Sequence, residues 1–176
     1  YAVGPVRFIA LDTDEGTTES ALLFRLPIDR AFSQRQLDWI EKQLAASTEP
    51  WKIVYGHHPI FSSGMHGMEA RPRQLAARLL PILKRYKVDL YIAGHDHHMQ
   101  HIEHDGIQFF ISGGGGRELR DPNSRVPAGV RALNERKAKR FGFLTVEAGP
   151  RALTAEMFTL GDDGKAVVLS RKELSK

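Results

Sequence analysis

Three short apolar segments each end abruptly on glycine, and this repeated pattern is the strongest constraint on the fold. They are "KIVYGHHP" (52–59), "DLYIAGHDHH" (89–98) and "FFISGGGG" (109–116). Each is rich in strand-forming residues and stops at a residue that permits a sharp backbone turn. In open α/β sheets, ligands collect beyond the carboxyl ends of such strands. The pattern therefore predicts buried β-strands whose ends carry functional side chains.

Two helical patterns alternate with these strand-like segments in the first half of the chain. Residues 33–47 place their apolar side chains on one face behind Ser33, a suitable N-cap. Residues 73–88 form a second pattern, whose internal Pro81 is expected to kink or divide the helix. The alternation of strands and helices favours the α/β class.

The other segments indicate more strands and one long loop. Strands are predicted at 6–13, 21–27 and 99–104, the last joined to the third apolar segment through a "DG" hairpin turn. The basic, polar stretch 117–140 contains two prolines and is predicted to be mainly loop. Residues 141–174 are predicted to form three antiparallel strands. We therefore expect one domain, 1–176, in which sheets pack together with helices outside.

The composition is that of an ordinary globular domain and excludes several kinds of site. The chain has 176 residues, 41% of them hydrophobic, which is enough to bury one substantial core. The net charge is +4 and aromatic residues are not interleaved with basic ones, so nucleic-acid binding is not indicated. Because there is no cysteine, a metal ion would have to be held by imidazole, carboxylate, phenolate or amide groups.

Histidines gather where two of the apolar strands end. His57 follows the glycine of one strand, and His95 and His97 follow the glycine of another. Since positions 95 and 97 are two residues apart, an extended backbone places both rings on the same side. Neutral imidazoles in this arrangement suit zinc, iron or manganese, so these three are candidate metal ligands; the alternative is ordinary turn histidines. His101 and His104 continue into the next strand and its turn, and are expected to be surface residues.

The order of the motifs points to a known family. "VYGHHPIFSSGMHG", "GHDHHMQHI" and "FFISGGGG", in this order after "QLDWIEKQLAAS", closely resemble the C-terminal half of the calcineurin-like metallophosphoesterases, most of all the small purple acid phosphatases. The resemblance implies the C-terminal half of an α/β/β/α sandwich, with mixed sheets and flanking helices. It also implies metal-dependent hydrolysis of phosphomonoesters. A phosphodiesterase of the same superfamily is the nearest alternative, because the ligand motifs are shared.

The resemblance assigns metal ligands residue by residue. His57 of "GHHP" and His95 of "GHDH" match ligands of the divalent metal, and His97 matches a ligand of the other metal, which is ferric iron in purple acid phosphatases. The implied cofactor is therefore a dinuclear centre of Fe with Fe, Zn or Mn. Two such cations neutralise phosphate oxygens and make hydroxide available for in-line attack.

The resemblance also implies roles in catalysis and binding. His66 of "GMHG" matches a histidine that contacts the phosphate ester and protonates the leaving group; the alternative is a mobile loop residue. His58 and His98 fill variable positions, where they either touch substrate or are merely exposed neighbours of the ligands. Three arginines of the following loop either attract the phosphate or form a solvated face: Arg117, Arg120 and Arg125.

The chain departs from the family pattern in one large respect. The opening part of the family motif supplies two aspartates, a tyrosine, an asparagine and a second histidine, and this part is not found here. We therefore expect the missing N-terminal half of the same enzyme as a partner, either lost by truncation or present as a separate chain. The alternative is a non-catalytic fragment that docks a partner chain and is aggregation-prone alone. The family resemblance suggests a secreted or periplasmic enzyme.

Overall fold

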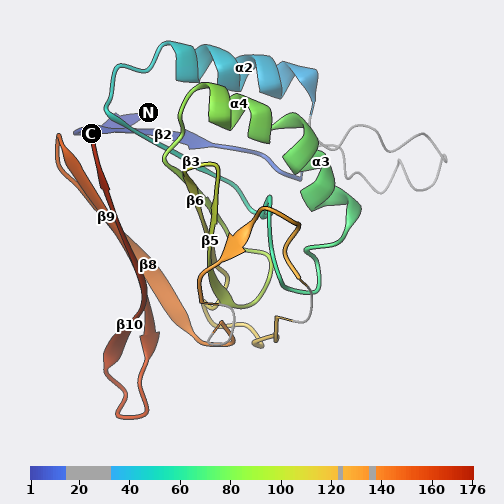
Figure 1. Ribbon diagram of the computed structural model, residues 1–176, viewed down its shortest axis with the longest axis vertical. Helices are drawn as coiled ribbons and strands as arrows, with labels where there is room; N and C mark the ends of the chain where they lie inside the picture. Colours follow the sequence, from blue (N-terminus) through green and yellow to red (C-terminus); the bar gives the residue numbers. More distant parts are fainter. Residues whose placement is uncertain (15–32, 123–124, 135–137) are drawn as a thin grey trace.

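The computed structural model describes residues 1–14, 33–122, 125–134 and 138–176, so the strand predicted at 21–27 lies outside the described part. Within these ranges the chain forms a larger mixed sheet and a smaller antiparallel sheet, with helices beside the larger one (Figure 1). The predicted α/β class, with mixed sheets and flanking helices, is confirmed. No helix in these ranges is both long and apolar enough to cross a membrane.

The larger sheet is built around four parallel strands. Its strands lie in the order β1 (Ala2–Val3), β2 (Val6–Ala10), β3 (Trp51–Tyr55), β4 (Leu90–Ala93), β6 (Ile107–Ser112), β5 (Met99–His104) and β7 (Arg131–Ala132). Strands β2, β3, β4 and β6 run parallel, whereas β1, β5 and β7 pair antiparallel with their neighbours. Parallel strands are usually covered on both faces, which explains why these four strands are mainly apolar. The carboxyl ends of β3 and β4 therefore lie next to each other.

In the described ranges, three helices cover one face of this sheet: α2 (Gln34–Ala45), α3 (Ala70–Arg78) and α4 (Leu80–Arg85). Helix α2 begins at Ser33, whose hydroxyl accepts a hydrogen bond from the helix backbone at 3.2 Å, and it buries Leu37, Ile40 and Leu44. Pro81 separates α3 from α4, as predicted. It lies in the first turn of α4, where a missing N–H breaks no intrahelical hydrogen bond.

The second sheet packs on the opposite face of the first. Strands β8 (Gly142–Ala148), β9 (Ala152–Leu160) and β10 (Ala166–Ser175) form the predicted antiparallel meander, with β9 in the middle. Leu153, Ala155 and Met157 of β9 are buried against Trp51 of the larger sheet. The Trp51 Nε1–H also donates a hydrogen bond to the Gly149 carbonyl at 2.7 Å. Among the described elements the layers are thus helices, larger sheet and smaller sheet (Figure 1).

Candidate metal centre

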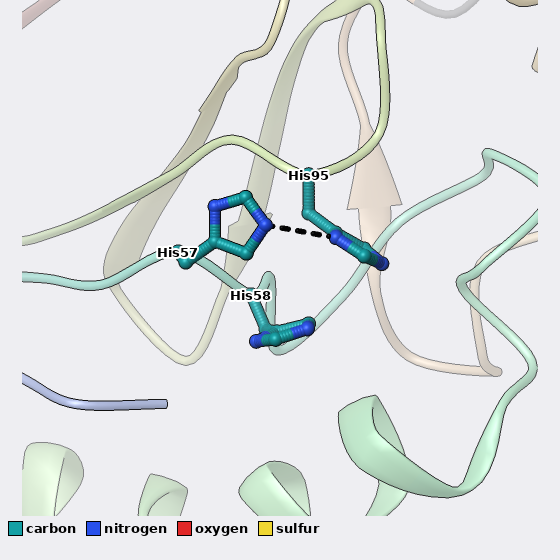
Figure 2. A group of neighbouring side chains, drawn as sticks. All are labelled: His57, His58 and His95. Atoms are coloured by element: carbon teal, nitrogen blue, oxygen red, sulfur yellow. Dashed lines mark hydrogen bonds between the residues drawn. The ribbon is translucent and has the colours of Figure 1, made fainter. Parts of the chain in front are cut away.

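Two histidines meet where β3 and β4 end. The strands are parallel neighbours, with Tyr55 in register with Ile92, so the loops that follow leave the sheet together. The Gly94 N–H donates a hydrogen bond to the carbonyl of His57 at 3.1 Å, which joins the two loops. The Nε2 atom of His57 consequently lies 3.0 Å from the Nδ1 atom of His95 (Figure 2). The structure therefore brings together two of the three predicted ligands.

An unusual backbone conformation places the ring of His95. Its φ angle is 65°, in the left-handed region that side chains with a Cβ disfavour. Gly94 does not have a positive φ, so the sharp turn expected at the glycine is made by the histidine itself. Holding a non-glycine residue there costs on the order of 1 kcal/mol, and such strain concentrates at functional sites.

His58 joins this pair as a third ring. Its ring centroid lies 4.3 Å from that of His95 and 4.8 Å from that of His57. One ring nitrogen from each of the three residues lies within 4.8 Å of the other two. The Thr13 hydroxyl fixes His58, because its Oγ1 accepts the backbone N–H at 2.9 Å and lies 3.1 Å from Nδ1. Three imidazoles from two adjoining loops thus gather in one place, as Figure 2 shows.

His97 lies apart from these three rings. Among the described residues, it belongs to neither of the two sets of three potential metal ligands whose donor atoms lie within 4.8 Å of one another. Its Nδ1 lies 3.0 Å from the carbonyl oxygen of Glu118, so Nδ1–H donates to that oxygen. In the neutral ring, this bond leaves Nε2 as the nitrogen with a lone pair. A metal-binding role for His97 stays a prediction.

His66 also lies next to this group of three histidine rings. Its ring centroid lies 4.4 Å from that of His95, and together with Glu69 the two histidines form the second set of neighbouring ligand atoms. The Nδ1–H of His66 donates to Glu69 Oε1 at 2.7 Å, and Nε2 lies 3.2 Å from Nη1 of Arg120. Arg120 is therefore the loop arginine that reaches the site, while the other two candidates are exposed. Glu69 is not among the residues predicted from the sequence, although its i,i+3 spacing from His66 is a usable signal.

A buried carboxylate, for which the sequence predicts no role, connects the two loops that carry the candidate ligands. Asp96 is 1% exposed and accepts hydrogen bonds from the Ser62 hydroxyl and, at 3.3 Å, from the His66 backbone N–H. Gly64 lies so close that a Cβ there would come within 2.5 Å of the Asp96 Cγ. Asp96 therefore ties the loop that carries His66 to the loop that carries His95.

The remaining histidines of the cluster lie in or near the core. His98 is 0% exposed; its Nε2 lies 3.3 Å from Gln100 Oε1, and its Nδ1 has no partner among the described residues. A molecule in solvent does not reach this ring in the observed conformation. His101 is equally buried and stacks on Phe110, so the expectation of a surface position is wrong: the second sheet covers it. His104 is partly exposed at the end of β5, as expected.

Burial and mutual repulsion favour the neutral form of two of the grouped rings, those of His58 and His95. Burial lowers the pKa of His58 to about 4; the neighbouring rings of His95 and His57 act in the same direction, and Asp14 opposes them. Burial also lowers the pKa of His95, with contributions from His66 and His57. A neutral imidazole offers the lone pair that a metal ion requires. Imidazole and carboxylate donors without thiolate fit zinc, iron or manganese.

The sequence matches one large family of metal-dependent hydrolases. The profile of the calcineurin-like phosphoesterases matches residues 9–99, which is more than half of the chain, and the chain therefore belongs to this family. It is 35% identical over 136 residues to tartrate-resistant acid phosphatase type 5 of Mus musculus, a match that covers 74% of this chain and 40% of the relative. It is 45% identical over 93 residues to purple acid phosphatase 4 of Arabidopsis thaliana, covering 52% of this chain and 26% of the relative. The chain thus spans at most about two fifths of the length of these relatives.

Solved structures share the fold. Purple acid phosphatase PPD1 from yellow lupin (Lupinus luteus) seeds superposes with a TM-score of 0.69 at 22% identity, covering 98% of this chain and 31% of that chain. GAP50, described as the anchor in the inner membrane complex of Plasmodium, gives a TM-score of 0.71 at 23% identity, covering 97% and 49%. These likenesses show the metallophosphoesterase fold, and with the sequence matches they confirm the resemblance to purple acid phosphatases.

Proposed function

We propose that this chain supplies part of the catalytic centre of a metal-dependent phosphomonoesterase of the purple acid phosphatase type. The observation that carries the proposal is the convergence of His57 and His95, 3.0 Å apart, with His66 against them. Similarity to acid phosphatases supports the reaction class. Because the chain spans 40% of the mouse relative, the activity is proposed for the assembled enzyme and not for this chain alone.

In the proposed centre, His57 and His95 bind the divalent ion and His97 binds the second ion, iron, in a pair of Fe with Fe, Zn or Mn. When bound, such a pair supplies Lewis acidity and hydroxide at neutral pH. The chain's own contribution is orientation. Two backbone-linked loops hold His57 and His95 together, and the hydrogen bond from His97 to the Glu118 carbonyl turns Nε2 into the donor atom.

His66 is the proposed proton donor. Glu69 accepts the Nδ1–H at 2.7 Å and fixes the ring, so Nε2 is the nitrogen that exchanges a proton with substrate. Arg120, whose Nη1 lies 3.2 Å from this Nε2, offers a guanidinium to the phosphate oxygens. A phosphate bound by Arg120 would draw the guanidinium away from Nε2 and would lie next to His66; in its imidazolium form, the ring would then give its Nε2 proton to the departing alkoxide.

The remaining ligands are proposed to come from the N-terminal part of the same enzyme, in a longer polypeptide or in a separate chain. Residues 1–176 are then the C-terminal portion of one metallophosphoesterase domain, and the substrate is a phosphate ester. The second sheet supports a partner, because Phe143, Leu160, Val167 and Val168 remain about half exposed there. Exposed apolar patches mark surfaces that contact another protein. The same exposed patch is also expected of a non-catalytic chain that docks a partner. A measurement of phosphatase activity therefore has to distinguish the catalytic from the non-catalytic alternative.

Metal content and hydrolysis, measured on one preparation, test the proposal. The protein is purified without chelators and with any co-purifying polypeptide retained; it is then analysed for metals and assayed with p-nitrophenyl phosphate and bis(p-nitrophenyl) phosphate. Two metals per assembly, one of them iron, with preference for the monoester and a loss of about 100-fold in His57→Ala, support it. His104→Ala, at the far end of β5, is the control and should remain active. Preference for the diester favours a phosphodiesterase, and full metal occupancy without hydrolysis favours the non-catalytic chain.

A further inference from the structure

The ring of His58 occupies a position that neither the family resemblance nor the strand pattern assigns to a metal ligand. We propose that His57, His58 and His95 together bind one zinc-class divalent cation on this chain, with His58 and not His97 as the third imidazole. The proposal rests on the proposed metal-dependent function for its biological meaning, but not for its test. Its basis is that one nitrogen from each of these three rings lies within 4.8 Å of the other two.

The spacing of the rings suits a tetrahedral ion. Zinc binds imidazole nitrogen at about 2.0–2.1 Å, which places two nitrogen ligands roughly 3.4 Å apart. The observed separation between His57 Nε2 and His95 Nδ1 is 3.0 Å, and one nitrogen of His58 lies within 4.8 Å of both, so side-chain rotation has to bring the third nitrogen closer. The hydrogen bond from the Gly94 N–H to the His57 carbonyl already joins the two loops that carry His57 and His95.

Thr13 gives His58 the support that metal-bound histidines usually have. The second nitrogen of a ligating imidazole normally bonds a neighbouring oxygen, which fixes the ring and its tautomer. The Nδ1 of His58 lies 3.1 Å from Thr13 Oγ1, which can accept Nδ1–H and leave Nε2 for the ion. Thr13 is itself 1% exposed, and its methyl group packs where a Cβ on Gly56 would approach within 2.6 Å. The buried Thr13 therefore fixes the His58 ring at Nδ1, the nitrogen opposite the proposed donor atom.

A carboxylate lies on the same side as the proposed donor atom. The Oδ1 atom of Asp14 is 3.8 Å from the Nε2 of His58. A zinc-class ion commonly takes a carboxylate oxygen beside three histidines, and the negative charge offsets that of the ion. Asp14 and Thr13 both follow β2, the strand next to β3 in the sheet. Three neighbouring parallel strands thus contribute to one site.

His97 offers the contrast that makes the proposal testable. Its Nδ1 is committed to the Glu118 carbonyl at 3.0 Å, and it belongs to neither described set of neighbouring ligand atoms. The family resemblance requires His97 for the second metal, whereas a single ion held by this chain needs His58. Binding of one ion to the chain therefore distinguishes the two histidines without reference to catalysis.

Titration with Co²⁺, followed by its visible absorption, and competition with Zn²⁺ measure this site on the chain as it is purified. We expect one Co²⁺ per chain with a four-coordinate spectrum. His58→Ala should weaken binding by about 100-fold or more, and by more than His97→Ala does, whereas His104→Ala, outside the site, should change it by less than about 3-fold. Thr13→Val keeps all three imidazoles and should weaken binding about 10-fold, because it removes only the supporting oxygen. Circular dichroism of each variant establishes folding, and His58→Gln replaces His58→Ala if the smaller side chain disrupts the fold.

The proposal is overturned if the folded wild-type chain binds no Co²⁺, or if His97→Ala abolishes binding while His58→Ala and His58→Gln retain it. Its failure is distinct from failure of the proposed function. An assembly that hydrolyses p-nitrophenyl phosphate and needs His97 but not His58 for its metals supports the function and overturns this inference. An inactive chain that loses its single Co²⁺ in His58→Ala overturns the function and supports the inference.

Discussion

The buried His101 makes a pH-dependent contribution to stability that one substitution can isolate. Its Nε2–H donates to Gln108 Oε1 at 3.0 Å, the Ser170 hydroxyl donates to Nδ1 at 2.7 Å, and the ring stacks on Phe110. Burial lowers the pKa of His101 to about 4; the bond to Gln108 opposes this shift and the nearby Lys172 adds to it. The neutral ring is therefore the form that the core accepts.

The sign of the effect follows from proton uptake. Between pH 6.5 and about 4 the unfolded chain protonates His101 and the folded protein does not, so the free energy of unfolding falls as the pH falls. One pKa unit corresponds to about 1.4 kcal/mol. A pKa near 6.5 in the unfolded chain and about 4 in the folded protein therefore predicts a loss of about 2 kcal/mol between pH 8 and pH 5.

Urea unfolding of the wild type and of His101→Gln at pH 8 and pH 5 measures this pH-dependent contribution to the free energy of unfolding. Burial also lowers the pKa of His58, His95 and His98, so only the difference between the two proteins isolates His101. The stability advantage of the wild type should shrink by about 2 kcal/mol from pH 8 to pH 5. Parallel stability curves for wild type and His101→Gln would refute the reasoning.

Three further substitutions and one control test contacts at the site and between the two sheets. Asp96→Asn should lower the free energy of unfolding by about 2 kcal/mol and speed hydrogen–deuterium exchange in the loop bonded to it, because charge-assisted hydrogen bonds are lost. Trp51→Phe removes the 2.7 Å hydrogen bond to Gly149 between the sheets and should cost about 1 kcal/mol or more in urea unfolding. In Gly113→Ala the new Cβ would lie 1.9 Å from the Asp96 carbonyl oxygen, so thermal denaturation should show a loss of about 2 kcal/mol. In Gly94→Ala the Cβ meets no described atom within 4 Å, and the effect should be much smaller.

Sequence patterns predict an element well when its burial is regular, either on both faces or along one face. The strand β3 lies inside a parallel sheet, and its sequence is accordingly apolar apart from Lys52. Helix α2 shows a single apolar stripe because one face packs on the sheet, and Ser33 caps it as its position suggests. Once β3 and β4 are parallel neighbours, the meeting of His57 and His95 follows, since both come directly after these strands.

Contacts between distant segments do not follow from periodicity. The position of His58 depends on Thr13, which lies 45 residues earlier in the chain. The position of His95 depends on its own φ of 65°, which no residue pattern signals. The burial of His101 depends on the second sheet, whose Ser170 lies 69 residues away. A local count of histidines therefore locates the site but does not separate ligands from core residues.

The histidines that follow β3 and β4 lie in two chemical environments. The partners of their ring nitrogens explain why a cation is expected in only one of these environments. In the core, His101 bonds an amide and a hydroxyl group, which together satisfy a neutral ring without any ion, and the Nε2 of His98 bonds the Gln100 amide. At the strand ends, the ring nitrogens of His57 and His95 instead face each other across 3.0 Å. When both lone pairs are available, such a pair is stabilised by a cation between the nitrogens, and binding energy then also offsets the strained backbone of His95. Metal binding is therefore expected to stabilise the strand ends and to leave the histidines of the core unchanged.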